Sequence, residues 1–256
     1  MNRIIYSLKR PRNILVFDVE TNGLLPKRKR GSLISPNIDE YPHILQLSYA
    51  IYDLEKYEIV ETYNAYIKIA ENVGINEFIT SLTGIDKNLC ETKGVPILDA
   101  LKQFYKAYMK CECIIAHNIE FDQKMILVEI ERNREYILEY TPYCILIFNK
   151  TYEELNNIEI YCTMRKGTNL CNIEYKPIEN SINNEKNEKI RKTIGKKFPK
   201  LSELYLKLFQ SSEVPINLHN SMVDVMVCLS CYLKMRHTIT QDYTKDISIV
   251  SSAVTV

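Results

Sequence analysis

Short apolar runs and segments with helical spacing succeed one another along the chain. Residues 13–24, NILVFDVETNGL, form an apolar run rich in β-branched and aromatic residues, and the run closes on Asn-Gly. This pattern predicts a strand buried on both faces and followed by a turn. Residues 43–52 and 58–69 alternate like strands, and the short turn 53–57 requires them to be antiparallel neighbours. The fold is therefore expected to open with a three-stranded meander.

Helical spacing begins after this meander. Residues 75–82 predict a short helix that stops at Gly84. Residues 96–108 predict a longer helix with Pro96 in its first turn, and this helix leads to a brief apolar strand at 113–116. A helix that connects strands of one sheet is a crossover, so we expect the later part of the fold to be parallel α/β.

Three more helical segments follow, one of them at 201–208, with a short strand after the first. We expect a helix over residues 118–134 with Asn118 as its cap, and a strand at 160–165 that ends at a functional edge. The last helix is expected to be capped by Asn220 or Ser221. Apolar residues occupy nearly all of its sides, which predicts a buried helix.

Length and composition are those of one globular domain. The 256 residues are 46% hydrophobic and 25% charged, with few glycines and prolines. We expect a single domain over residues 1–240 with polar insertions at about 25–42 and 169–198, followed by a tail at 241–256. This arrangement belongs to the α/β class.

Cysteine usage and charge limit the environment and the partners. The 8 cysteines lack zinc-site spacing, and no signal peptide or long apolar span is present. These features favour an intracellular protein, cytoplasmic or nuclear, that is neither secreted nor in a membrane. The runs at 27–30 and 186–200 are basic and suit a polyanion. The alternatives are solvated charge or, for the first run, a nuclear import signal.

Two acids at the end of the first strand suggest a metal site. Asp18 and Glu20 stand two residues apart, so both carboxylates point to one face of the strand, about 6–7 Å apart along it. Burial and mutual repulsion would protonate them unless bound cations keep both ionised. We therefore hypothesise a divalent metal site. The alternative is a pair of acids at a solvated strand end.

Two more acids and a histidine occur where helices begin. Asp122 falls in the first turn of a helix that follows a strand, at the edge where α/β sheets bind ligands. Asp224 lies in an apolar helix, where an unpaired carboxylate costs several kcal/mol. His219 precedes that helix. The alternatives are ordinary first-turn chemistry for Asp122 and capping or core packing for His219.

These side chains can form one site if the sheet brings them together. Four carboxylates can hold two divalent ions in the arrangement that serves phosphoryl displacement. Oxygen ligands suit Mg²⁺ or Mn²⁺ better than zinc. A neutral imidazole can accept a proton from the attacking water.

Three segments then resemble a known family. Residues 17–24, FDVETNGL, match D-x-E-T-x-G-L; residues 116–122, AHNIEFD, match H-N-x-x-F-D; and residues 219–224, HNSMVD, match H-x-x-x-x-D. In this order they resemble the exonuclease motifs of the DEDDh 3′→5′ exonucleases, which are DnaQ-like. The resemblance implies a ribonuclease-H-like fold: a mixed five-stranded sheet, antiparallel and then parallel, flanked by helices.

The resemblance also implies a role for each polar residue. Asp18 would bridge two metal ions, Mg²⁺ or Mn²⁺. Glu20 and Asp224 would complete the ion that binds the nucleophilic water, and Asp122 would serve the second ion. His219 would be the general base. The implied activity is 3′→5′ exonucleolytic removal of nucleoside monophosphates.

Substrate contacts and partners follow from the same resemblance. Thr21 and Leu24 would hold the terminal nucleotide, Leu24 and Leu82 would wedge against bases, and Asn118 would lie near the phosphate. The expected substrate is a single-stranded or frayed 3′ end of DNA, with RNA as the alternative. A second copy of the chain or a polymerase stays open as a protein partner. The rival functions are an exoribonuclease or oligoribonuclease, and an inactive nucleic-acid-binding or polymerase-associated module.

Overall fold

The computed structural model describes residues 11–27, 36–174 and 196–245. Most of the basic run at 27–30 and most of the insertion at 169–198 lie outside these residues. Within the described part, no helix is long and apolar enough to cross a bilayer.

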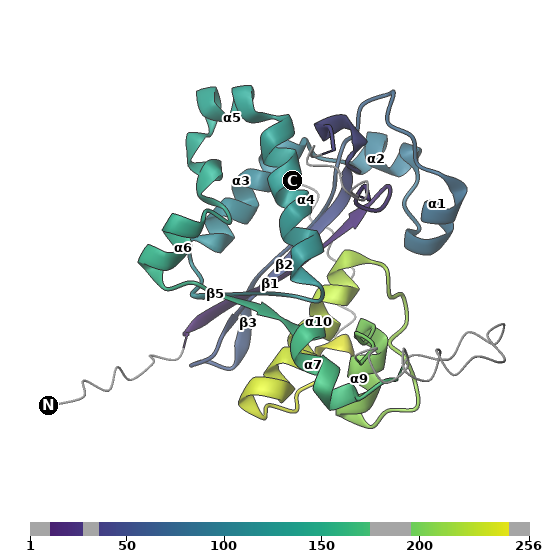
Figure 1. Ribbon diagram of the computed structural model, residues 1–256, viewed down its shortest axis with the longest axis vertical. Coiled ribbons are helices and arrows are strands. Elements are labelled where there is room, and N and C mark those ends of the chain that lie inside the picture. Colours follow the sequence, from purple (N-terminus) through teal and green to yellow (C-terminus); the bar gives the residue numbers. More distant parts are fainter. Residues whose placement is uncertain (1–10, 28–35, 175–195, 246–256) are drawn as a thin grey trace, which may run out of the picture.

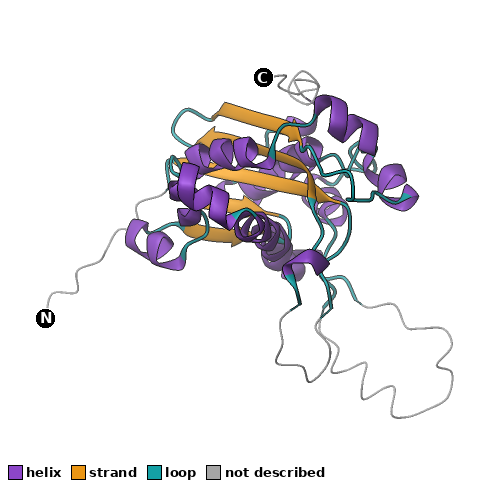
Figure 2. Cartoon of the chain, turned by 90° about the horizontal axis from the view of Figure 1, so that it is seen from above, coloured by secondary structure: helices purple, strands orange, loops and turns teal. Residues whose placement is uncertain are grey.

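A five-stranded mixed sheet forms the centre of the fold (Figure 2). Its strand order is β3-β2-β1-β4-β5. The strands are β1 (Asn13–Thr21), β2 (Ile44–Asp53), β3 (Glu58–Tyr66), β4 (Cys113–Ala116) and β5 (Glu159–Cys162). The first three pair antiparallel, whereas β1 with β4 and β4 with β5 pair parallel. This topology confirms the predicted meander followed by parallel strands, and it makes β1 the central strand.

Helices cover both faces of the sheet (Figure 1). One face carries α3 (Ile97–Tyr108), α4 (Ile119–Arg132), α5 (Arg134–Tyr140) and α6 (Lys150–Asn156). The other carries α7 (Thr163–Cys171), α9 (Leu201–Phe209) and α10 (Ser221–His237). Two short helices, α1 (Glu77–Thr83) and α2 (Lys87–Lys93), follow β3. The described residues also contain the 3₁₀ turns η1 (Ile38–Glu40), η2 (Pro142–Leu146) and η3 (Tyr243–Lys245).

The alternation of side chains along β1 divides the core in two. Leu15, Phe17 and Val19 pack into the cluster under α3 and α4. Ile14 and Val16 pack into the cluster under α10. Burying each such side chain contributes about 1.5–3 kcal/mol. Because the even-numbered positions face α10, the next one, residue 18, also points toward the start of α10.

Two local expectations are wrong. Asn118 does occupy the N-cap position of α4, but its backbone is left-handed (φ 71°) and its side chain makes no capping bond. The predicted strand at 160–165 ends at Cys162, because Thr163 already begins α7. By contrast, Gly84 ends α1 in the left-handed conformation (φ 73°), as expected.

Parts of the expected tail and of the first insertion are packed. Tyr243, in the segment 241–245, is buried against α10, and its backbone N–H donates to Ser230 Oγ at 3.0 Å. In the segment 36–42, three backbone carbonyls accept hydrogen bonds from the guanidinium of Arg132. Both segments therefore contact the globular part of the protein.

A close backbone approach at the end of α2 gives a test of the fold. A Cβ added at Gly94 would lie 2.6 Å from Lys68 N and 2.8 Å from the carbonyl carbon of Ile67. Since these are main-chain atoms, we expect Gly94→Ala to destabilise the protein by about 1–3 kcal/mol in urea unfolding. Gly74→Ala is the matched control, because its Cβ would meet nothing within 4 Å. Equal midpoints for the two variants would contradict this packing.

Candidate active site

The structure brings together the five polar residues singled out in the sequence. Asp18 and Glu20 lie on β1, and Asp122 lies in the first turn of α4. Asp224 lies in the first turn of α10, and His219 stands just before that helix. Asp18 is close enough to the other three acids for each of them to raise its pKa by repulsion. Three segments distant in sequence thus meet at one end of β1.

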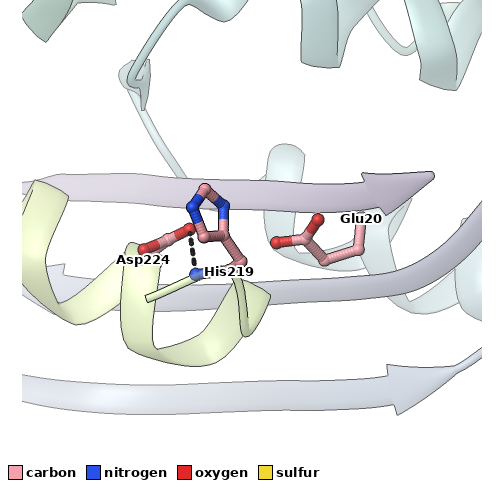
Figure 3. A group of neighbouring side chains, drawn as sticks. All are labelled: Glu20, His219 and Asp224. Atoms are coloured by element: carbon pink, nitrogen blue, oxygen red, sulfur yellow. Dashed lines mark hydrogen bonds between the residues drawn. The ribbon is translucent and has the colours of Figure 1, made fainter. Parts of the chain in front are cut away.

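Three of these side chains form a compact group. One ligand atom from each of Glu20, His219 and Asp224 lies within 4.8 Å of the others. Figure 3 shows the two carboxylates and the imidazole turned toward one another. Asp122 is 3% exposed, and its Oδ1 accepts a hydrogen bond from the backbone N–H of Val19 in β1 at 3.3 Å. That bond ties the start of α4 to β1 between Asp18 and Glu20.

Crowding and burial raise the pKa of every acid in the cluster. Burial is the main cause for each one, and repulsion from neighbouring carboxylates adds to it for Asp18, Glu20 and Asp122. The pKa rises to about 8 for Glu20 and Asp122 and to about 7 for Asp224. The pKa of Asp18 lies well above its usual range. Acids that hold protons this tightly when no cation is bound form a site that is suited to bind cations.

The imidazole of His219 is positioned by its backbone. This residue adopts a left-handed conformation (φ 72°), and its N–H donates to Asp224 Oδ2 at 3.2 Å, as the dashed line in Figure 3 shows. Burial and the nearby Lys200 ammonium lower the pKa of the imidazole. His219 is consequently neutral at neutral pH, with a ring nitrogen able to accept a proton.

The donor set fits a hard divalent cation. Asp224 Oδ1 is buried and has no hydrogen-bond partner among the described residues, although its other oxygen accepts from His219. A buried carboxylate oxygen without a donor is costly unless a cation receives it. Carboxylate oxygens are the ligands that Mg²⁺ and Mn²⁺ prefer. The residues present therefore fit a metal ion.

The turn after β1 is held by an asparagine. The backbone N–H of Asn22 donates to His43 O at 3.1 Å, and its side-chain oxygen accepts from His43 N at 2.7 Å. Its side-chain nitrogen donates to Gly74 O at 2.9 Å. Asn22 thus joins three chain segments beside the acidic cluster.

The residues expected to contact a substrate have varied surroundings. Thr21 is buried, and its hydroxyl donates to Gly23 O at 2.7 Å, so it stabilises the turn. Leu24 is 85% exposed and Leu82 on α1 is 39% exposed. Asn118 lies at the start of α4, four residues before Asp122. Leu24 and Leu82 therefore offer apolar surface that a ligand can cover.

Two residues of structural importance near the site escaped the sequence analysis. Asn22 is one, although it lies inside the first motif. His117 is the other: its Nδ1 lies 3.0 Å from Thr163 Oγ1 and its Nε2 lies 3.0 Å from Pro199 O. Burial lowers the pKa of His117 to about 4, which keeps the ring neutral. Its place in the second motif was a signal, but only the fold identifies its partners.

Comparisons with solved structures show the fold. The chain is similar to Escherichia coli Exonuclease I in complex with a dT13 oligonucleotide, with a TM-score of 0.56 and 16% identity over 88% of this chain. It is also similar to the same enzyme with a dA16 oligonucleotide, with a TM-score of 0.54 and 15% identity over 88% of this chain. The chain spans only 42% and 41% of those proteins, respectively.

Sequence comparison identifies the family. No curated protein matches the chain at the level of sequence. The sequence model of the Exonuclease family matches residues 15–172, which include the first two motifs and exclude the third. The matched range covers more than half of the chain, and the fold agrees with that of a known exonuclease. The chain belongs to the Exonuclease family.

Proposed function

We propose that the protein is a 3′→5′ exonuclease that removes nucleoside monophosphates from the 3′ end of single-stranded DNA with the help of two divalent metal ions. The observation that carries this proposal is the grouping of four carboxylates and His219 at the end of β1. Exonuclease-family proteins generally use divalent metal ions. The sequence order of the three motifs supports the 3′→5′ polarity.

The acids supply the metal ligands in this proposal. Asp18, Glu20, Asp122 and Asp224 would hold Mg²⁺ or Mn²⁺, which activates water and stabilises the attacking and leaving oxygens of a phosphodiester when bound. The hydrogen bond from Val19 N to Asp122 Oδ1 orients that carboxylate. The bond from His219 N orients the carboxylate of Asp224 and leaves its second oxygen available.

His219 is the proposed general base. Its imidazole lies beside Glu20 and Asp224 and is neutral because its pKa is lowered. A ring nitrogen can then take the proton of the attacking water. The positive charge of nearby Lys200 helps to keep the imidazole unprotonated until that step. Residue 219 is exposed, so the proton can pass on to solvent.

Single-stranded DNA is the substrate supported best. Similar structures include Escherichia coli Exonuclease I bound to dT13 and to dA16. The exposed Leu24 and Leu82 provide apolar surface against which bases can pack regardless of sequence. The alternative is an exoribonuclease of the same fold, and the experiment below distinguishes it from a DNA exonuclease.

A cleavage time course tests the function. We expect 5′-labelled single-stranded DNA to shorten stepwise in Mg²⁺ or Mn²⁺ and to stay intact in EDTA. A 3′ label should leave in the first step, as a mononucleotide. Asp18→Asn should abolish cleavage, because one carboxylate charge at the centre of the cluster is lost. Faster cleavage of matched RNA would make the protein an exoribonuclease, and binding of DNA without cleavage would make it a binding module.

The role of His219 has its own test. His219→Asn keeps a residue that tolerates the left-handed backbone while removing the base. We expect the single-turnover rate to fall by about 10²–10⁴-fold, with binding of Mn²⁺ retained. Titration of Mn²⁺ by electron paramagnetic resonance checks the second point. A variant with the wild-type rate would show that another group accepts the proton.

Stability should depend on pH through the acidic cluster. The pKa values of about 7 to 8 exceed those of an unfolded chain, so the folded, metal-free protein binds more protons above about pH 4. Its free energy of unfolding should therefore fall as pH rises from about 4 to about 8 and level off above that range. We expect the melting temperature in EDTA to drop between pH 6 and pH 9, and Mn²⁺ to restore it most at pH 9. In Asp18→Asn, the melting temperature should drop less over the same pH range. An equal drop in the wild type and in this variant would show that the acidic cluster does not cause the pH dependence.

A further inference from the structure

Four buried polar side chains lie between the sheet and the start of α10. Gln46 and Ser48 belong to β2, Asn64 to β3 and Ser221 to the first turn of α10. Asn64 is 3% exposed and the other three are fully buried. Their hydrogen bonds form a closed ring, which we call the polar ring. Neither the proposed metal ligands nor the proposed base belongs to it.

The direction of each hydrogen bond in the polar ring follows from one backbone N–H. Ser221 N can only donate, so the Gln46 atom 3.3 Å away is the acceptor Oε1. Gln46 Nε2 then donates to Asn64 Oδ1 at 2.8 Å. Ser48 Oγ, 2.9 Å from the same oxygen, must also donate to it. Since Ser48 has one hydroxyl proton, Ser221 Oγ is the donor in the short Ser48–Ser221 bond that closes the ring.

The polar ring stands directly beside the acidic cluster. In the β1–β2 register, Ser48 is the partner of Asp18 and Gln46 is the partner of Glu20. Opposite residues of an antiparallel pair point to the same face, so the polar ring and these acids share one face of the sheet. Ser221 stands three residues before Asp224, within the same first turn of α10.

Most of the remaining contact between α10 and the sheet is apolar; the polar contacts lie far from the site, where Arg236 pairs with Glu159 of β5 and the Tyr232 hydroxyl lies 3.8 Å from Cys113 Sγ of β4. Met222, Val225, Met226 and Leu229 pack into the cluster beneath the helix. Such contacts are not directional, so by themselves they tolerate a small shift of the helix along the sheet. A hydrogen-bonded ring of neutral groups is satisfied in one position only. It also adds no charge next to four carboxylates.

We propose that Gln46, Ser48, Asn64 and Ser221 are positioning residues that set the place of α10 and thereby hold Asp224 and His219 at the right distance from Asp18 and Glu20. The proposal rests on the function proposed above. The acids would bind metal, and the polar ring would keep the acids of β1 and α10 at a fixed distance from one another. Residues that orient metal ligands in this way contribute about 10–100-fold to metal affinity or activity.

The test compares Gln46→Leu with Ser230→Ala. Gln46→Leu removes two bonds of the polar ring with little change in volume. Ser230→Ala removes a hydroxyl from α10 that is as fully buried as Gln46. Ser230 lies nine residues after Ser221, and its hydroxyl donates to Met226 O and accepts from Tyr243 N. Both variants should lose stability and are assayed at a temperature where circular dichroism shows them folded.

Only the variant in the polar ring should affect the site. We expect Gln46→Leu to lower kcat and the affinity for Mn²⁺ by about 10–100-fold, with KM for the oligonucleotide unchanged. Ser230→Ala should match the wild type in all three. The proposal would be overturned if the folded Gln46→Leu protein kept the kcat and the Mn²⁺ affinity of the wild type. It would also be overturned if Ser230→Ala lost as much kcat and Mn²⁺ affinity as Gln46→Leu.

A second pair of variants tests the ring as a unit. Ser48→Ala and Ser221→Ala should each weaken Mn²⁺ binding, and the double variant should be little worse than Ser48→Ala, because that change alone already removes the bond between the two hydroxyls as well as the bond to Asn64. If the loss of Mn²⁺ affinity in the double variant equalled the sum of the losses in the two single variants, the two serines would not act as one hydrogen-bonded unit. Titration of Mn²⁺ without nucleic acid separates the two proposals. If the wild type binds no metal, the proposed function fails and this inference with it; if it binds metal and the variants bind equally well, only this inference fails.

Discussion

Like charges held together at the end of β1 are the constraint on which the rest of the structure depends. Burial raises the pKa of all four acids, and repulsion reinforces the effect. Such a cluster opposes folding unless protons or cations neutralise it, so the apolar packing on both faces of the sheet must hold it in place. The central position of β1, with helices over both faces, provides that packing.

Much of the fold could be predicted because its signals are local. The unbroken apolar run of β1 and the short turn between β2 and β3 determine the meander, and helices between apolar strands determine the parallel half. The acidic cluster was predictable for a different reason. Asp18 and Glu20 share a face by strand periodicity, while Asp122 and Asp224 each stand where a helix begins. The cap at Asn118 was predicted wrongly because side-chain preference does not reveal a left-handed backbone.

The polar residues of β2 show why the remainder could not be predicted. Gln46 and Ser48 alternate with apolar residues, a pattern that ordinarily marks a strand with one face in water. Every residue of β2 is nevertheless buried, because α10 returns from the far end of the chain to cover that face. Contacts over such a separation leave no periodic signal. The same holds for Arg132, whose bonds to three carbonyls of the preceding insertion depend on two segments about 90 residues apart.

The order of the elements along the chain has a consequence for the newly made protein. Asp18, Glu20 and Asp122 are translated early, whereas His219 and Asp224 belong to the last long helix. Domains generally fold as units, and the last segment of a domain leaves the ribosome last. A nascent chain from which all five strands have emerged still lacks one of the acids and the imidazole until α10 follows. The site is therefore completed late, and a chain whose synthesis stops before α10 carries only part of the acidic cluster.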